Sequence, residues 1–142
     1  MKFRDYFSLK HILFALLLFA ILIPFAIRDS NNQVKVTFDD TSVYAKSSKY
    51  SMTIRYDEIQ SVFLTELTEP GEKVQDGYDD DILRAGLWKN DLWGEYHINA
   101  DLDATNCVLL RLKDNRYFVI SQKDNETTLE IYDTLVSKIP EA

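Results

Sequence analysis

The sequence is poor in the residues that covalent cross-linking and catalysis require. Its 142 residues include one cysteine and two histidines, so an intramolecular disulfide and a cysteine-rich zinc site are both excluded. Cys107 lies in the apolar run CVLLRL and is interpreted as a small buried side chain of a strand rather than a nucleophile. His97 has no recognisable nucleophile context around it and is interpreted as a structural or surface residue.

Glycine is also scarce, and phosphate-binding loops depend on it. The four glycines are too widely spaced for a dinucleotide or nucleotide loop, and the nucleophile elbow of the hydrolases is absent. We therefore expect no catalytic residues and no cofactor. The acidic stretch DGYDDD (residues 76–81) does not have the spacing of a calcium-binding loop. It is interpreted as a solvated loop, and a metal-binding or hydrolytic domain that uses it is kept as an alternative.

Positive charge is lacking after the first 28 residues. Residues 1–28 have a net charge of +3, whereas residues 29–142 hold twelve basic and twenty-two acidic side chains, a net charge of −10. Such a surface repels phosphate groups, which argues against nucleic acid as a partner and against docking on anionic lipid head groups.

The longest apolar run lies near the N-terminus. Sixteen uncharged apolar residues, ILFALLLFAILIPFAI, extend from Ile12 to Ile27. They predict a transmembrane helix over residues 12–28, preceded by a short tail (residues 1–11) and followed by a linker (residues 29–33). A cleaved signal peptide and a buried core helix are the alternatives. The basic residues before the run favour a single-pass cell-membrane protein whose domain lies on the outer face.

After the linker, the hydrophobic period changes from helical to two residues. Strands are expected near residues 34–38, 43–46, 50–56, 61–69, 87–99, 107–112 and 116–121, with a long exposed loop over residues 70–86. The last segment is helical, because Leu129, Tyr132, Leu135, Val136 and Ile139 form a stripe. Asp124 or Asn125 can cap this helix at its start.

The order of five short motifs resembles the bacterial pleckstrin-homology-like (PH-like) domains. The motifs are IRYDEIQSVFLTE (54–66), PGEKVQDGY (70–78), GLWKNDLWGEY (86–96), CVLLRLKDNRYFVIS (107–121) and ETTLEIYDTL (126–135). The resemblance implies that residues 34–140 form a mostly β domain, a partly open seven-stranded antiparallel barrel capped by one C-terminal α-helix. The first turn, FDDTS, is acidic where lipid-binding members are basic, which argues against phosphoinositide binding.

These observations predict a membrane-anchored, non-catalytic PH-like module that binds or scaffolds protein or peptide partners, with the lipid bilayer contacted through the N-terminal helix. A structural subunit of a membrane complex is a further alternative. The aromatic motif is expected to place at least one tryptophan in the core. The candidate interaction surface consists of Trp88, Trp93, Arg111, Lys113 and Arg116.

Overall fold

The chain forms two units, Met1–Asn31 and Asn32–Ala142. The computed structural model describes residues 10–22 and 33–140, and residues 10–22 are helical and exposed. Within these described ranges no helix is long and apolar enough to cross a membrane. This finding contradicts the prediction of a transmembrane helix over residues 12–28. Residues 23–28 of that prediction, and residues 29–32 of the linker, lie outside the described residues.

The first sheet of the second unit has three antiparallel strands, in the order β1-β2-β3. They are β1 (Lys35–Phe38), β2 (Ser42–Lys46) and β3 (Ser51–Arg55). The acidic turn between β1 and β2 is held by Asp39, whose Oδ1 accepts hydrogen bonds from the backbone N–H groups of Thr41 and Ser42 at 2.8 and 2.6 Å. The Asp39 carboxylate therefore stabilises the turn between β1 and β2.

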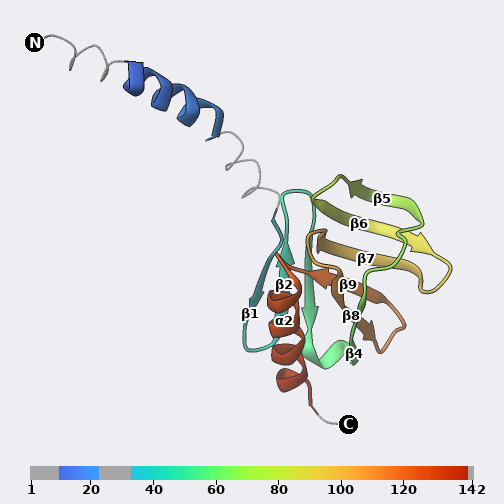
Figure 1. Cartoon of the computed structure of the whole chain (residues 1–142). Helices are drawn as coiled ribbons and strands as arrows, with labels where there is room; N and C mark the ends of the chain where they lie inside the picture. Colours follow the sequence, from blue (N-terminus) through green and yellow to red (C-terminus); the bar gives the residue numbers. More distant parts are fainter. Residues whose placement is uncertain (1–9, 23–32, 141–142) are drawn as a thin grey trace, which may run out of the picture. The chain divides into compact units, whose positions relative to one another are not determined.

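The second sheet has six strands in the order β4-β8-β9-β7-β6-β5 (Figure 1). A short 3₁₀ turn at Tyr56–Glu58 leads into it. Strand β9 lies between β7 and β8, parallel to β7 and antiparallel to β8. The strands are β4 (Ile59–Glu66), β5 (Glu72–Asp79), β6 (Leu83–Asn90), β7 (Gly94–Asp101), β8 (Asn106–Leu112) and β9 (Tyr117–Ser121).

The predicted seven-stranded antiparallel PH-like barrel is therefore wrong in strand number and in pairing. The described residues form nine strands in two sheets, one of which contains a parallel pair. The expected loop over residues 70–86 instead contains β5 and the first half of β6. Strand β5 is an exposed edge strand whose register shifts twice, so its side chains do not alternate between apolar and polar.

One glycine explains how β5 approaches β6. Gly86 has φ +97°, and a Cβ there would lie 2.1 Å from the carbonyl oxygen of Asp76. Asp76 itself has a positive φ of 53°. The close contact between the β5 bulge and the β6 backbone thus requires glycine at position 86.

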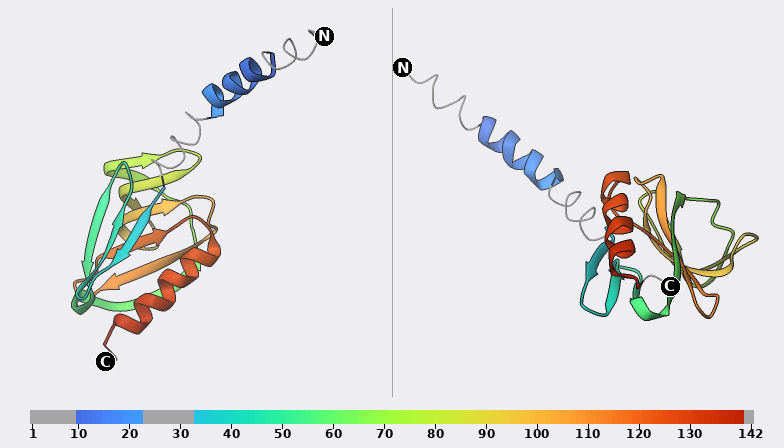
Figure 2. Two further views of the ribbon diagram at one scale, coloured as in Figure 1. Left: turned by 90° about the vertical axis from the view of Figure 1, so that its left-hand side faces the viewer. Right: turned by 90° about the horizontal axis from the view of Figure 1, so that it is seen from below.

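The C-terminal helix α2 (Asn125–Lys138) confirms the predicted helix and its cap. Asp124 Oδ1 accepts a hydrogen bond from the Thr127 N–H at 2.8 Å. The helix lies along one side of the space between the two sheets (Figure 2), where it buries Thr128, Ile131 and Leu135.

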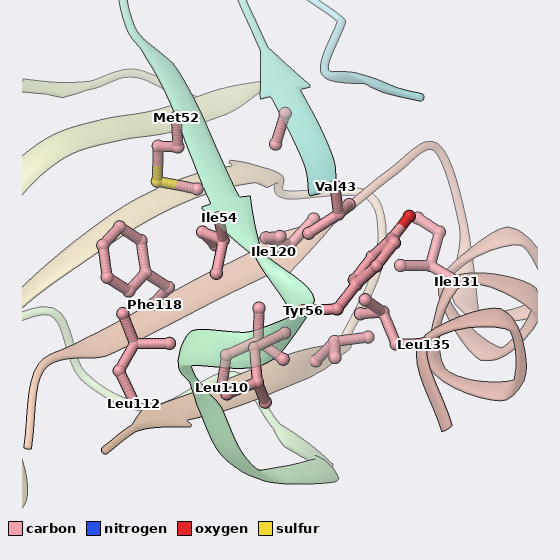
Figure 3. Close-up of a cluster of buried hydrophobic side chains, with 13 residues drawn as sticks. Val43, Met52, Ile54, Tyr56, Leu110, Leu112, Phe118, Ile120, Ile131 and Leu135 are labelled. Carbon is pink, nitrogen blue, oxygen red and sulfur yellow. The ribbon is translucent and has the colours of Figure 1, made fainter. Parts of the chain in front are cut away.

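The main core lies between the two sheets and α2. Figure 3 shows β2 and β3 on one side of this cluster, β8 and β9 on the other, and the helix at the open side. Fully buried members include Val43, Leu110, Ile120 and Leu135. The opposite face of the six-stranded sheet carries a second cluster, made of Trp88, Tyr96, Ile98, Ala100, Cys107, Leu109 and Val119. Cys107 is 0% exposed, which confirms the interpretation of a small buried side chain on a strand. Burial raises the pKa of its thiol to about 12.

A buried asparagine joins the two sheets. Asn99 on β7 is 0% exposed. Its Nδ2 donates to the carbonyl oxygens of Ala45 and Tyr50 at 3.2 and 2.9 Å, and its Oδ1 accepts from Ser47 Oγ at 2.7 Å. Because all three bonds reach β2 or the turn that follows it, they hold the β2–β3 hairpin at a defined position over β7.

Candidate binding surface along β4 and helix α2

Strand β4 is an edge of the six-stranded sheet, with β8 as its neighbour. Its register with β8 is regular from Ser61 to Glu66. Just beyond it, the Leu67 N–H donates to the Thr105 carbonyl oxygen at 2.8 Å. Antiparallel strands form hydrogen bonds through alternate residues. The backbone N–H and C=O groups of Val62, Leu64 and Glu66 therefore point away from β8, outward from the free edge of the sheet.

Exposed apolar side chains accompany this edge. Phe63 is 49% exposed and Leu64 is 37% exposed. Leu64 is on the side of β4 that faces α2, because its cross-strand partner Val108 belongs to the main core. Phe63 is opposite Leu109, which belongs to the second cluster, so it is on the other side. An edge strand with exposed apolar side chains on both faces is suited to pairing with a further strand.

Helix α2 adds two apolar side chains beside β4. The helix packs against β8, β4 and β9, and its Leu129 and Val136 are 43% and 51% exposed. These residues are seven apart and share one flank. Lys138, about 200° from Val136 around the helix, lies over the Tyr56 ring at 5.7 Å. The Tyr56 hydroxyl donates to the Asp39 carbonyl oxygen in the β1–β2 turn at 2.8 Å, which places Lys138 on the flank toward the first sheet. The flank with Leu129 and Val136 therefore faces β4.

We use the name β4–α2 groove for the surface made of the free edge of β4 and this flank of α2. Its apolar members are Leu64, Leu129 and Val136, and the same two elements carry carboxylates. Glu66 ends β4, and Glu126 and Asp133 lie one helical turn from Leu129 on exposed positions of α2. The groove thus offers backbone hydrogen-bonding groups, an apolar strip and a negative rim. This set of groups is suited to binding an extended peptide.

The two tryptophans of the predicted interaction surface, Trp88 and Trp93, have different environments. Trp88 is 3% exposed, and its Nε1–H donates to the Ala85 carbonyl oxygen at 2.9 Å. This confirms that one tryptophan belongs to the core. Trp93 is half-buried in the turn between β6 and β7, with its ring edge-on to Tyr96 at 5.1 Å between centroids. Tyr96 in turn donates from its hydroxyl to the Pro70 carbonyl oxygen at 2.6 Å.

The three basic residues of the predicted surface, Arg111, Lys113 and Arg116, belong to the β8–β9 hairpin and make different contacts. Arg116 pairs with Asp114 at 2.7 Å and stacks over Phe118. Lys113 is in the turn after β8, where its backbone N–H donates to the Glu58 carbonyl oxygen. Arg111 is opposite Tyr117 and donates to Asn115 at 2.8 Å. Among the described residues its buried Nε has no hydrogen-bond partner. Each cation thus has its own local surroundings.

The carboxylates of residues 76–81 also diverge. Asp79 pairs with Arg84 at 3.1 Å, and Asp80 Oδ1 accepts hydrogen bonds from the backbone N–H groups of Ile82 and Leu83, both at 2.7 Å. In residues 10–22 and 33–140 no group of three or more His, Cys, Asp or Glu side chains is placed to hold a metal ion. This acidic stretch forms the second half of β5 and the start of the turn to β6.

A small cleft lies beside the β2–β3 turn and is lined by residues of that turn and of β5, β6 and β7. The Tyr50 hydroxyl is 2.7 Å from His97 Nδ1, and the His97 ring stacks on Phe118 with centroids 4.5 Å apart. The cleft has a volume of about 160 Å³, and its lining is completed by Gln75, Asp76 and Leu87.

Both titratable groups of the Tyr50–His97 pair favour their neutral forms. Burial, and secondarily the positive charge of Arg116, lowers the pKa of His97. Burial, and secondarily the charge of Asp76, raises the pKa of Tyr50. The pair is a neutral hydrogen bond between the two sheets, and we assign it a structural role.

Sequence reasoning missed the groove for two reasons. The apolar stripe predicted for the C-terminal helix includes Leu129 and Val136, whereas the residues that the helix buries are Thr128, Ile131 and Leu135. In the strand predicted over residues 61–69, Phe63 and Leu64 gave apolar character to both faces. That pattern was a signal of an edge with an unpaired apolar surface, but it resembles a fully buried strand equally well.

No family model, no curated protein and no solved structure matches this chain. The resemblance to the bacterial PH-like domains and the localisation at the cell membrane therefore stay predictions from the sequence.

Proposed function

We propose that this protein is a non-catalytic binding module that takes up an extended segment of a partner protein along the β4–α2 groove. The observation that carries the proposal is the eight-residue edge strand β4 with exposed Phe63 and Leu64, beside the exposed Leu129 and Val136 of α2. In this mode of recognition the added strand gains backbone hydrogen bonds from the sheet edge, and side-chain contacts select the sequence.

A selection experiment tests the proposal. The full-length chain is immobilised and used to select from a displayed library of random peptides, and the affinities of recovered peptides are measured for the unchanged chain and two variants. Leu64→Ala shortens the side chain but keeps the backbone N–H. Leu64→Pro also removes that N–H, which points away from β8, so the ladder with β8 keeps its bonds.

We expect Leu64→Pro to bind the peptides at least about tenfold more weakly than Leu64→Ala, which corresponds to about 1.4 kcal/mol. Thermal melting of both variants serves as the control that each one is folded. Equal affinities for the two variants, or a selection that recovers no peptide, would show that the edge of β4 is not the binding site.

A further inference from the structure

We infer that the partner segment is basic: an extended peptide in which an apolar side chain faces Leu64 and a Lys or Arg two residues away faces Glu66. This inference rests on the proposed function and adds the chemical class of the partner. It is carried by the charges around the groove and by their position along it.

The charges of the two elements that form the groove are almost all negative. The only charged residue of Ile59–Glu66 is Glu66, and Asn125–Lys138 contains Glu126, Glu130 and Asp133 before Lys138. Lys138 lies over the Tyr56 ring on the opposite flank. The side chains of these two elements that face the groove therefore include carboxylates but no cation.

Two carboxylates, those of Glu66 and Glu126, lie at the same end of the groove. Glu66 is opposite Asn106 in the β4–β8 register, and the Asn106 N–H donates to Asn125 Oδ1 at 2.9 Å. This contact places the first turn of α2, with Glu126, at the Glu66 end of β4. The other end of β4 carries both signs of charge, because Arg55, Asp57, Glu58, Lys113 and Asp114 lie together there. The Glu66 end is therefore the one that favours a cation.

The spacing of the partner's side chains follows from strand geometry. Val62, Leu64 and Glu66 alternate onto the side of β4 that faces α2. A strand paired with β4 directs every second side chain to that same side. One such side chain faces Leu64, and the next one on that side, toward the end of β4, faces Glu66. An apolar residue and a cation two positions apart satisfy both.

A second copy of this chain is a poorer occupant of the groove. Residues 29–142 have a net charge of −10, so two copies joined along β4 would bring like charges together, which opposes association. A basic segment gains from the same charges. The acidic rim therefore favours a basic partner over self-pairing.

Four synthetic peptides test the inference. Each has seven residues and blocked ends. In the first, a central valine is followed two positions later by arginine, in the second the arginine precedes it by two positions, and threonine fills the other positions. The third and fourth carry glutamate instead of arginine. Affinity for the full-length chain is measured by titration calorimetry at low and high salt.

We expect one of the arginine peptides to bind at least about tenfold more tightly than its glutamate counterpart at low salt, with a smaller advantage at high salt because mobile ions screen the carboxylates. Glu66→Gln should remove most of that advantage, whereas Glu95→Gln on β7 should keep it.

Equal or tighter binding of the glutamate peptides would overturn the inference. So would a dimer of the full-length chain, seen by sedimentation, that dissociates in Leu64→Pro. If the displayed library instead yields uncharged peptides that depend on the Leu64 N–H, the proposed function stands and the basic class fails. If no peptide from either source binds, the proposed function itself fails.

Discussion

The two edges of the six-stranded sheet have the same length and opposite characters. Strand β5 has two register shifts against β6, a residue with positive φ at Asp76 and four charged side chains. Strand β4 is in regular register from Ser61 to Glu66 and exposes Phe63 and Leu64. Bulges and charges are common ways to prevent a sheet edge from pairing with other chains. The comparison teaches that one edge of this sheet is protected and the other is available.

The largest effect that sharpens this comparison concerns the helix beside β4. Leu135 is 0% exposed, so Leu135→Ala should lower the free energy of unfolding by about 2–5 kcal/mol. The adjacent exposed Val136 should give a change within about 0.5 kcal/mol when changed to alanine. Urea unfolding of both variants measures the pair. A large loss for Val136→Ala would mean that its side chain already has a partner within the chain, which would remove it from the groove.

A smaller effect separates the β5 edge from an ordinary turn. Gly86 and Gly94 both have positive φ, but a Cβ at Gly94 meets nothing within 4 Å, whereas one at Gly86 would collide with Asp76. Alanine at either position costs about 1–2 kcal/mol for the backbone conformation, and at Gly86 the collision adds about 1–3 kcal/mol. We expect Gly86→Ala to be the less stable variant by thermal melting. Equal stabilities would show that the β5 bulge adjusts freely and does not depend on glycine.

The smallest effect is a pH dependence of stability on the β5 side of the molecule. The pKa of His97 is lowered by burial below its ordinary value of 6.5. In the window just below pH 6.5 the unfolded chain binds a proton that the folded chain does not, so stability is full above pH 6.5 and is lost as the pH falls through the lowered pKa. We expect His97→Gln to reduce the slope of unfolding free energy against pH between about pH 6.5 and 5.

His11→Gln, which changes the only other histidine of the sequence, is the control and should retain that slope. Urea unfolding at several pH values measures both variants. An unchanged slope in His97→Gln would show that another group causes the pH dependence and that the Tyr50–His97 hydrogen bond is equally stable at both ends of the range.

The predictability of the fold differed between elements for identifiable reasons. The hairpin of β2 and β3, the hairpin of β8 and β9, and helix α2 carry strong local patterns: alternating apolar residues around a short turn, and a capping residue at Asp124 before a helical stripe. Strand β5 carries no such pattern, because its side chains are mostly exposed and its register shifts. The sequence therefore predicts a loop where β5 forms.

The candidate site shows the same division. The aromatic motif GLWKNDLWGEY correctly indicated a core tryptophan, because a large apolar side chain between strand residues is buried in most folds. It could not indicate that Leu64, Leu129 and Val136 are exposed, since an apolar residue on a strand or helix has the same local pattern whether or not another element covers it.

The sequence by itself determined where most strands and the C-terminal helix form, because period, turn residues and caps act between near neighbours. It also determined the acidic character of the domain. The tertiary structure alone decided that β9 enters between β7 and β8 and that β4 is an end of the sheet. Those outcomes depend on contacts between residues far apart in the chain, and these contacts leave no local period in the sequence.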